Sequence, residues 1–176
     1  MRNLNSTEQR GAALIASLML LVVMMLIGAT AVGISGVENT MAGNMKDKTL
    51  AFQAAEEALR DGEQALFDMT RRPKTVSSCT TPPCEVWSLK ALGDVLAKDT
   101  AWWQANGVPY PQVIAYVDTQ PSRTIEYRSR KSDSLVRGRS IAGTIRWFYT
   151  VTARGTGSSD SGESLLQSLY STRFNL

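Results

Sequence analysis

An uncharged apolar segment near the N-terminus constrains this chain more than any other feature. It runs for 26 residues, from Ala12 to Val37, and the nearest charges are Arg10 before it and Glu38 after it. A helix of that length would span roughly 39 Å, which exceeds the ~30 Å hydrocarbon core of a bilayer. The apolar core of a secretory signal is usually only about 7–15 residues long. The segment therefore predicts a retained transmembrane helix rather than a signal sequence that is removed.

Three glycines lie inside this segment, at Gly28, Gly33 and Gly36. Soluble helices disfavour glycine, whereas membrane helices tolerate it. Two interpretations stay open, namely ordinary membrane-helix composition, and close helix approach or local melting when the helix leaves the bilayer. The flanking charges do not set the orientation by the positive-inside rule. Because only eleven residues precede the segment, we expect the foldable part of the chain to follow it across the membrane.

The helix is predicted to continue through residues 38–72, because no strong breaker occurs before Pro73. Apolar residues in this part recur at steps of three, four and seven, which places them on one helical face. We expect the face from Phe52 to Leu66 to pack on a sheet as part of the core. The predicted stripe consists of Met41, Met45, Phe52, Ala55, Leu59 and Leu66.

The remaining residues, 73–176, are predicted to form a globular head. Residues 86–107 favour one or two short helices, in which one of the adjacent Trp102 and Trp103 packs inward and the other lies nearer the surface. Four stretches with β-branched and aromatic residues predict strands, and the last two should pair as an antiparallel hairpin across a polar turn. The four stretches are 112–119, 123–130, 145–155 and 164–172. A long helix on an antiparallel sheet is an α+β fold.

Several short motifs resemble a known family over about residues 9–64. The leader ends in "QRG" at residues 9–11, "MAGN" occupies 41–44, and "AFQAAEEALR" occupies 51–60. These features are similar to PilX-type minor pilins of type IV pili. The resemblance implies that prepilin peptidase cleaves between Gly11 and Ala12, which removes the leader 1–11, and that Ala12 is then N-methylated. It also implies a pilin-like helical spine, with a single-pass inner-membrane anchor and a periplasmic head.

One position departs from the pattern of the major pilins, which carry a glutamate at the fifth mature residue. That position here is Ala16. A carboxylate inside a bilayer is costly and marks a function or a partner, and the resemblance implies that its partner is the N-terminal amine of a neighbouring subunit. This chain offers its own amine at Ala12 but lacks the acceptor. One-directional pairing suits the end of a filament, while the alternative is drift in a low-copy subunit that inserts anywhere.

The two cysteines, Cys79 and Cys84, lie in a tight loop with two prolines. If the head is periplasmic, oxidation to a disulfide is expected. Free thiols and a metal site are the alternatives, although a metal site would need further ligands and the chain has no histidine. So small a ring should stabilise the fold less than a bridge over a long loop.

Charge is unevenly distributed over the predicted head. The helix stretch 56–68 is acidic, and the stretch from Arg123 to Arg154 is basic. Three interpretations are solvated faces that pair locally, docking against an acidic neighbouring subunit, and DNA contact, which the lack of interleaved aromatic residues disfavours. The basic residues are Arg123, Arg128, Arg130, Lys131, Arg137, Arg139, Arg146 and Arg154.

The sequence predicts a structural and assembly protein rather than an enzyme, with no cofactor and no catalytic residues. Histidine is absent, and no spacing of serine and lysine suggests an activated nucleophile. The main hypothesis is a minor pilin that co-assembles with other minor pilins, and possibly the major pilin, to prime type IV pilus assembly. It would sit at or near the pilus tip and support a large tip adhesin, in cell adhesion and twitching motility. The alternatives are a signal-anchored periplasmic binding module and a minor pseudopilin of type II secretion.

Overall fold

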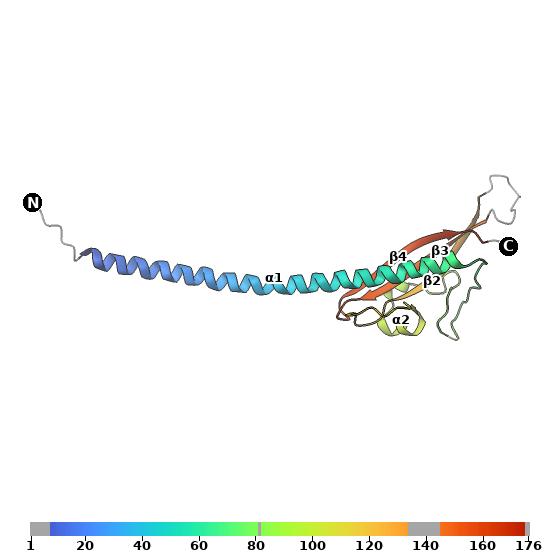
Figure 1. The fold of residues 1–176 in the computed structure, drawn as a ribbon, viewed down its shortest axis with the longest axis horizontal. Helices are drawn as coiled ribbons and strands as arrows, with labels where there is room; N and C mark the ends of the chain where they lie inside the picture. Colours follow the sequence, from blue (N-terminus) through green and yellow to red (C-terminus); the bar gives the residue numbers. More distant parts are fainter. Residues whose placement is uncertain (1–7, 81, 134–144, 175–176) are drawn as a thin grey trace, which may run out of the picture. The chain divides into compact units, whose positions relative to one another are not determined.

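A computed structural model describes residues 8–80, 82–133 and 145–174 of the chain (Figure 1). Two compact units meet within one long helix, the first ending at Asn44 and the second beginning at Met45. The elements in chain order are the helix α1 (Glu8–Asp68), the 3-10 helix η1 (Val95–Ala97), the helix α2 (Thr100–Asn106), and the strands β1 (Val108–Pro109), β2 (Ser122–Ser132), β3 (Ile145–Thr156) and β4 (Glu163–Thr172).

The strands form one antiparallel sheet in the order β1-β2-β3-β4. β3 and β4 pair along their length, from Trp147 opposite Thr172 to Thr156 opposite Glu163. The polar turn between them closes the expected hairpin. The predicted α+β fold, a long N-terminal helix packed on an antiparallel sheet, is therefore confirmed.

The prediction of a strand over residues 112–119 is wrong, because this stretch is a loop. The side-chain amide of Gln120 bonds both the N–H and the carbonyl of Ile114, at 2.9 and 3.0 Å, and so closes the stretch on itself. Tyr116 adopts a left-handed backbone, with φ at 65°, which an extended strand does not allow. Local closure therefore overrides the alternating apolar pattern.

The inner face of the sheet packs against α1 through small residues. Ala51, Ala55 and Ala58 are completely buried. A Cβ atom built on Gly155 would overlap the backbone of Ala51 and Ala55, so the helix lies directly on β3 at this point. Further along α1, Leu66 joins an apolar cluster of sheet and loop residues that consists of Val86, Ile125, Tyr149, Val151 and Phe174.

The predicted core face of α1 needs a correction at its N-terminal end. Ala55 and Leu66 are fully buried and Leu59 packs against the core, but Phe52 is 48 % exposed. Met41 and Met45 are also exposed. The reason is geometric, since successive residues turn by about 100° and Phe52 therefore points away from the alanine row that faces β3. The close approach selects alanine there and leaves the larger side chains outside.

A second apolar cluster covers part of the outer face of the sheet. It contains Trp87, Leu92, Val95 and Trp103, with Leu165 of β4 packed against it. The backbone of Trp87 extends the edge of β2, since its N–H donates to Ile125 and its carbonyl accepts from Tyr127, at 2.8 and 2.9 Å. Trp103 is buried and Trp102 lies nearer the surface, as the sequence predicted. The head thus has three layers, namely helix, sheet and cover.

Candidate assembly interface

The N-terminal part of α1 is an uncovered apolar surface. Its large side chains, from Leu14 to Val37, are between 46 and 76 % exposed. This is the one helix within the described residues that is long and apolar enough to cross a membrane. Two of its hydroxyl groups donate back to helix carbonyls, that of Ser17 to Leu14 at 2.9 Å and that of Thr30 to Ile27 at 2.9 Å. Internally satisfied polar groups are the condition for residing in lipid.

The residues expected to take part in processing and pairing all lie on this helix. Gly11, Ala12 and Ala16 are exposed on α1. At Ala16 the helix presents only a methyl group, and the segment from Gly11 to Val37 contains no acidic residue. The three glycines of the segment have open space where a side chain would stand. The helix can therefore be approached closely there by another helix.

Local ion pairs account for three residues of the basic stretch. Arg123, whose side chain is 9 % exposed, bonds Asp61 of α1 at 2.5 Å. Arg154 is 3 % exposed and bonds Glu163 at 2.9 Å. Arg146 lies 3.5 Å from Asp133. Of the other basic residues, Arg137 and Arg139 lie outside the described residues.

The remaining three, Arg128, Arg130 and Lys131, are exposed on β2. Arg130 lies over the ring of Trp147, 5.8 Å from its centroid. Arg128 and Lys131 form no ion pair within the part of the chain that the structure describes. The nearby acid Asp133 already interacts with both Arg173 and Arg146. The hydrogen bond from Arg173 is the main cause that lowers the pKa of the Asp133 carboxyl.

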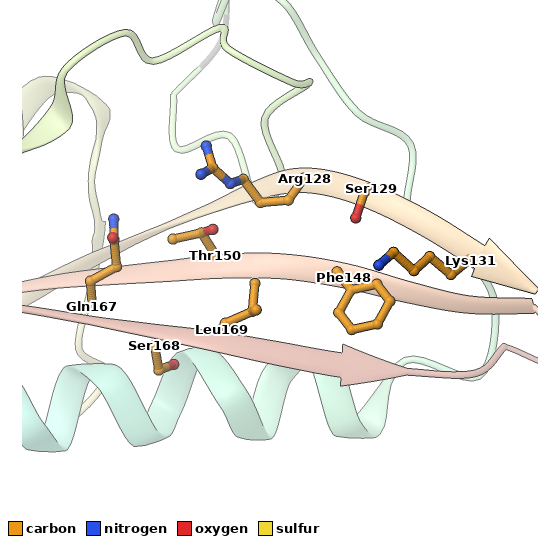
Figure 2. Close-up of a pocket in the computed structure, with 8 residues that line it drawn as sticks. All are labelled: Arg128, Ser129, Lys131, Phe148, Thr150, Gln167, Ser168 and Leu169. Atoms are coloured by element: carbon orange, nitrogen blue, oxygen red, sulfur yellow. The ribbon is translucent and has the colours of Figure 1, made fainter. Parts of the chain in front are cut away.

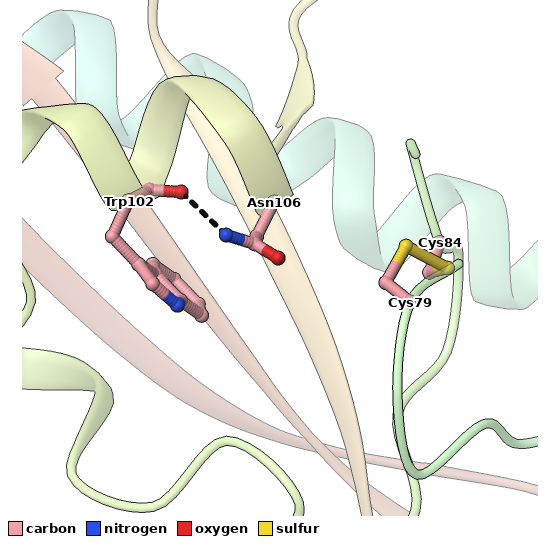
Figure 3. Close-up of a disulfide and its surroundings, with 4 residues drawn as sticks. All are labelled: Cys79, Cys84, Trp102 and Asn106. Atoms are coloured by element: carbon pink, nitrogen blue, oxygen red, sulfur yellow. Dashed lines mark hydrogen bonds between the residues drawn. A yellow bond between two sulfur atoms is a disulfide. The ribbon is translucent and has the colours of Figure 1, made fainter. Parts of the chain in front are cut away.

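Cys79 and Cys84 form a disulfide (Figure 3). Both cysteines pack against the tryptophan cluster that covers the outer face of the sheet. Nearby, the amide of Asn106 donates to the carbonyl of Trp102 at 3.0 Å and closes the last turn of α2. The disulfide therefore belongs to the cover of the head.

Asp47 connects α1 to the turn between β3 and β4, a role that was not predicted from the sequence. Its carboxylate accepts from the N–H and hydroxyl of Ser158, at 2.5 and 2.6 Å, and from the hydroxyl of Ser159 at 2.7 Å. These hydrogen bonds, above all those from the two hydroxyls, lower the pKa of Asp47. A Cβ atom at Gly157 or Gly162 would overlap this carboxylate. The glycines around the serines of the β3–β4 turn were the available signal, since they make room for the acid.

Two family models match the chain. The model described as PilX N-terminal matches residues 10–60, and the model described as Type IV pilus assembly protein PilX C-term matches residues 63–172. No curated protein and no solved structure matches significantly. The first match covers most of α1 and the second covers the sheet with its cover. Because the second match alone spans more than half of the chain, the chain belongs to the PilX family of type IV pilus assembly proteins, whose members are structural rather than enzymatic.

Proposed function

We propose that this chain is a minor pilin that co-assembles with other minor pilins, helps to prime type IV pilus assembly and sits at or near the pilus tip, where it supports an adhesin. Membership of the PilX family supports the role in pilus assembly. The finer proposal depends on Ala16, which presents a methyl group where major pilins carry a carboxylate. A subunit without that carboxylate can donate its N-terminal amine to a neighbour but cannot accept one.

The proposed route begins in the bacterial inner membrane. Residues 12–37 span the bilayer once, with the head in the periplasm. Prepilin peptidase removes residues 1–11, and Ala12 becomes the methylated N-terminus. The helix then passes into the fibre, where the exposed apolar side chains from Leu14 to Val37 pack against the helices of neighbouring pilins. Apolar side chains suit both surroundings, because each lacks competing water.

The N-terminal mass of the full chain tests this route directly. The chain is produced in cells with and without prepilin peptidase and measured by intact-mass spectrometry. We expect loss of residues 1–11 and addition of one methyl group on Ala12 only in cells with the peptidase. The variant Gly11→Val should stay uncleaved in both. An intact N-terminus in both cell types would contradict the pilin proposal and favour an ordinary anchored periplasmic domain.

A further inference from the structure

Within the described residues, the tryptophan cluster covers only one end of the outer face of the sheet. Ser168 of β4 donates to Glu63 of α1 at 2.7 Å, so Ser168 faces the helix. Since side chains alternate along a strand, Leu165 and Leu169 both point to the outer face. The tryptophan cluster covers Leu165, whereas Leu169 is 66 % exposed. The uncovered end therefore begins between these two leucines.

This uncovered end is hollowed, with a volume of about 470 Å³ (Figure 2). Side chains from all three long strands surround the hollow, among them Arg128 and Lys131 of β2, Phe148 of β3 and Leu169 of β4. We call it the outer hollow. Phe148 is partly exposed, and Thr150 beside it is 8 % exposed. The outer hollow thus has apolar residues at β3 and β4 and cations along β2.

A β-bulge brings the cations to this face. The pairing of β2 with β3 shifts between Tyr127 and Ser129, after which Ser129 lies opposite Phe148 and Lys131 opposite Arg146. Tyr127 belongs to the inner core. The extra residue lets Arg128 and Ser129 share the outer face and returns Lys131 to it. Without the bulge, Lys131 would point toward the helix side.

Most carboxylates of the head are engaged elsewhere, and Glu126 of β2, whose Oε1 is buried without a hydrogen-bond partner in the described chain, forms no ion pair with Arg128 or Lys131 there. The engaged acids accept hydrogen bonds from helix N–H groups, arginines, serines or a glutamine. They are Asp47, Glu56, Asp61, Glu63, Asp68, Asp94, Asp99, Asp133, Asp160 and Glu163. The exposed acids that form no pair in the described ranges are Glu57, Glu85 and Asp118, which come from three separate segments. In the acidic stretch 56–68, arginines pair with Glu56 and Asp61, and Glu63 faces the sheet at Ser168. A second copy of this chain therefore offers there only Glu57 and Asp68, which lie about three helical turns apart, to match Arg128 and Lys131.

The mixture of apolar and cationic groups favours a protein partner over a nucleic acid. Interfaces between proteins place apolar anchors at the centre and polar groups at the rim. Single-stranded nucleic acids need freely accessible aromatic faces for stacking. Among the described residues that line the outer hollow, Phe148 is the one aromatic, and it is half-buried. Trp147 packs with the inner core instead, where the guanidinium of Arg72 lies 4.1 Å from its ring centroid.

We infer that the outer hollow is the docking site for the head of a different pilin subunit, which inserts an aliphatic side chain between Phe148 and Leu169 and places carboxylates against Arg128 and Lys131. The inference rests on the proposed function, because it takes the partner to be a co-assembling pilin. Opposite charges on the two surfaces accelerate encounter and fix the docking register. The apolar contact supplies the buried centre of the interface.

Site-specific photocrosslinking in living cells tests this inference. Ser171 is exposed on β4 and lies opposite Phe148, so a photoreactive amino acid at Ser171 reports on the outer hollow without replacing a residue that lines it. We expect a crosslink to another pilin subunit, at a segment with carboxylates that mass spectrometry identifies. The double variant R128E/K131E should lower the crosslink yield at least about tenfold, since like charges then face each other.

Reversing the charges of the identified carboxylates on the partner should restore the crosslink to R128E/K131E. The matched control is K46E/K90E, which reverses two exposed lysines outside the outer hollow and should leave the yield unchanged. Retained tryptophan fluorescence shows that each variant is folded. An undiminished crosslink in R128E/K131E, or crosslinks only to lipid, nucleic acid or a second copy, would overturn the inference. Normal N-terminal processing in the same cells would leave the pilin proposal intact.

Discussion

Single glycines and alanines decide how closely α1 approaches the sheet. Gly155 of β3 lies against the backbone of Ala51 and Ala55, and Gly62 of α1 lies against the side chain of Val151. Layers this close make many dispersion contacts and leave little room to adjust. Added volume at these positions should therefore be costly.

We predict that Gly155→Ala lowers the free energy of unfolding by about 1–3 kcal/mol, because the new methyl group meets the helix backbone rather than a movable side chain. Gly43→Ala is the matched control, since Gly43 is an exposed helix residue with open space around it. That substitution should be neutral or slightly stabilising, because alanine favours helix. Denaturant unfolding of the full chain in detergent, followed by tryptophan fluorescence, measures both. Equal stabilities of the two variants would contradict the close approach.

Asp47 predicts a pH dependence of stability. Its pKa is lowered from 3.8 by the hydrogen bonds from Ser158 and Ser159, so the folded head favours the charged form. That contribution is fully present above the ordinary pKa and disappears as the pH falls through the lowered value. We expect Asp47→Asn to melt below the native chain at pH 7, with a difference that closes under strongly acidic conditions. Glu57→Gln, at an exposed acid, should show no such difference. A gap in melting temperature that persists at low pH would refute this role.

At the scale of the elements, the ion pair between Arg123 of β2 and Asp61 of α1 joins helix and sheet. Breaking a buried pair leaves an uncompensated charge, so Asp61→Ala should lower the free energy of unfolding by about 3 kcal/mol. Glu56→Ala removes the partner of Arg60, which is exposed, and should cost less than about 1 kcal/mol.

The double variant D61A/R123M checks the cause, because it removes both charges together. We expect it to recover part of the stability that Asp61→Ala loses, since methionine needs no partner in the interior. Denaturant unfolding of the three variants gives the comparison. If the double variant has a lower free energy of unfolding than Asp61→Ala, packing of the arginine stem contributes more to stability than its charge does.

The elements differ in how far the sequence predicts them. The apolar run to Val37, the hairpin of β3 and β4 and the short helix with Trp103 all follow from composition and periodicity. The loop at 112–119 does not, because its apolar alternation is opposed by the amide of Gln120, the next residue, which folds back onto Ile114. The face of the sheet on which Lys131 lies could not be predicted from the sequence either, since a single bulged residue reverses it. The prediction that Phe52 is buried is wrong for a third reason, because helix and sheet lie too close together to leave room for its ring.

At the scale of the whole molecule, Ala16 predicts where the subunit sits in a pilus. If the missing carboxylate confines it to a filament end, Ala16→Glu should spread it along the shaft and raise its copy number per pilus. Ala16→Gln is the control of equal size without the charge, and it should keep the native distribution. Immunogold labelling of an epitope on the head measures both. Native subunits already distributed along the shaft would contradict the confinement to an end.

The exposed apolar part of α1 has a consequence for the energetics of the proposed passage from the membrane into a pilus. The hydroxyls of Ser17 and Thr30 bond to the backbone of the helix itself, and the large side chains from Leu14 to Val37 are exposed. The proposed transfer of this segment from lipid to a pilus therefore leaves these two hydrogen bonds in place. The work of the proposed extraction is then set by the difference between lipid and the packed helices of a fibre, and it does not require the three layers of the head to unfold.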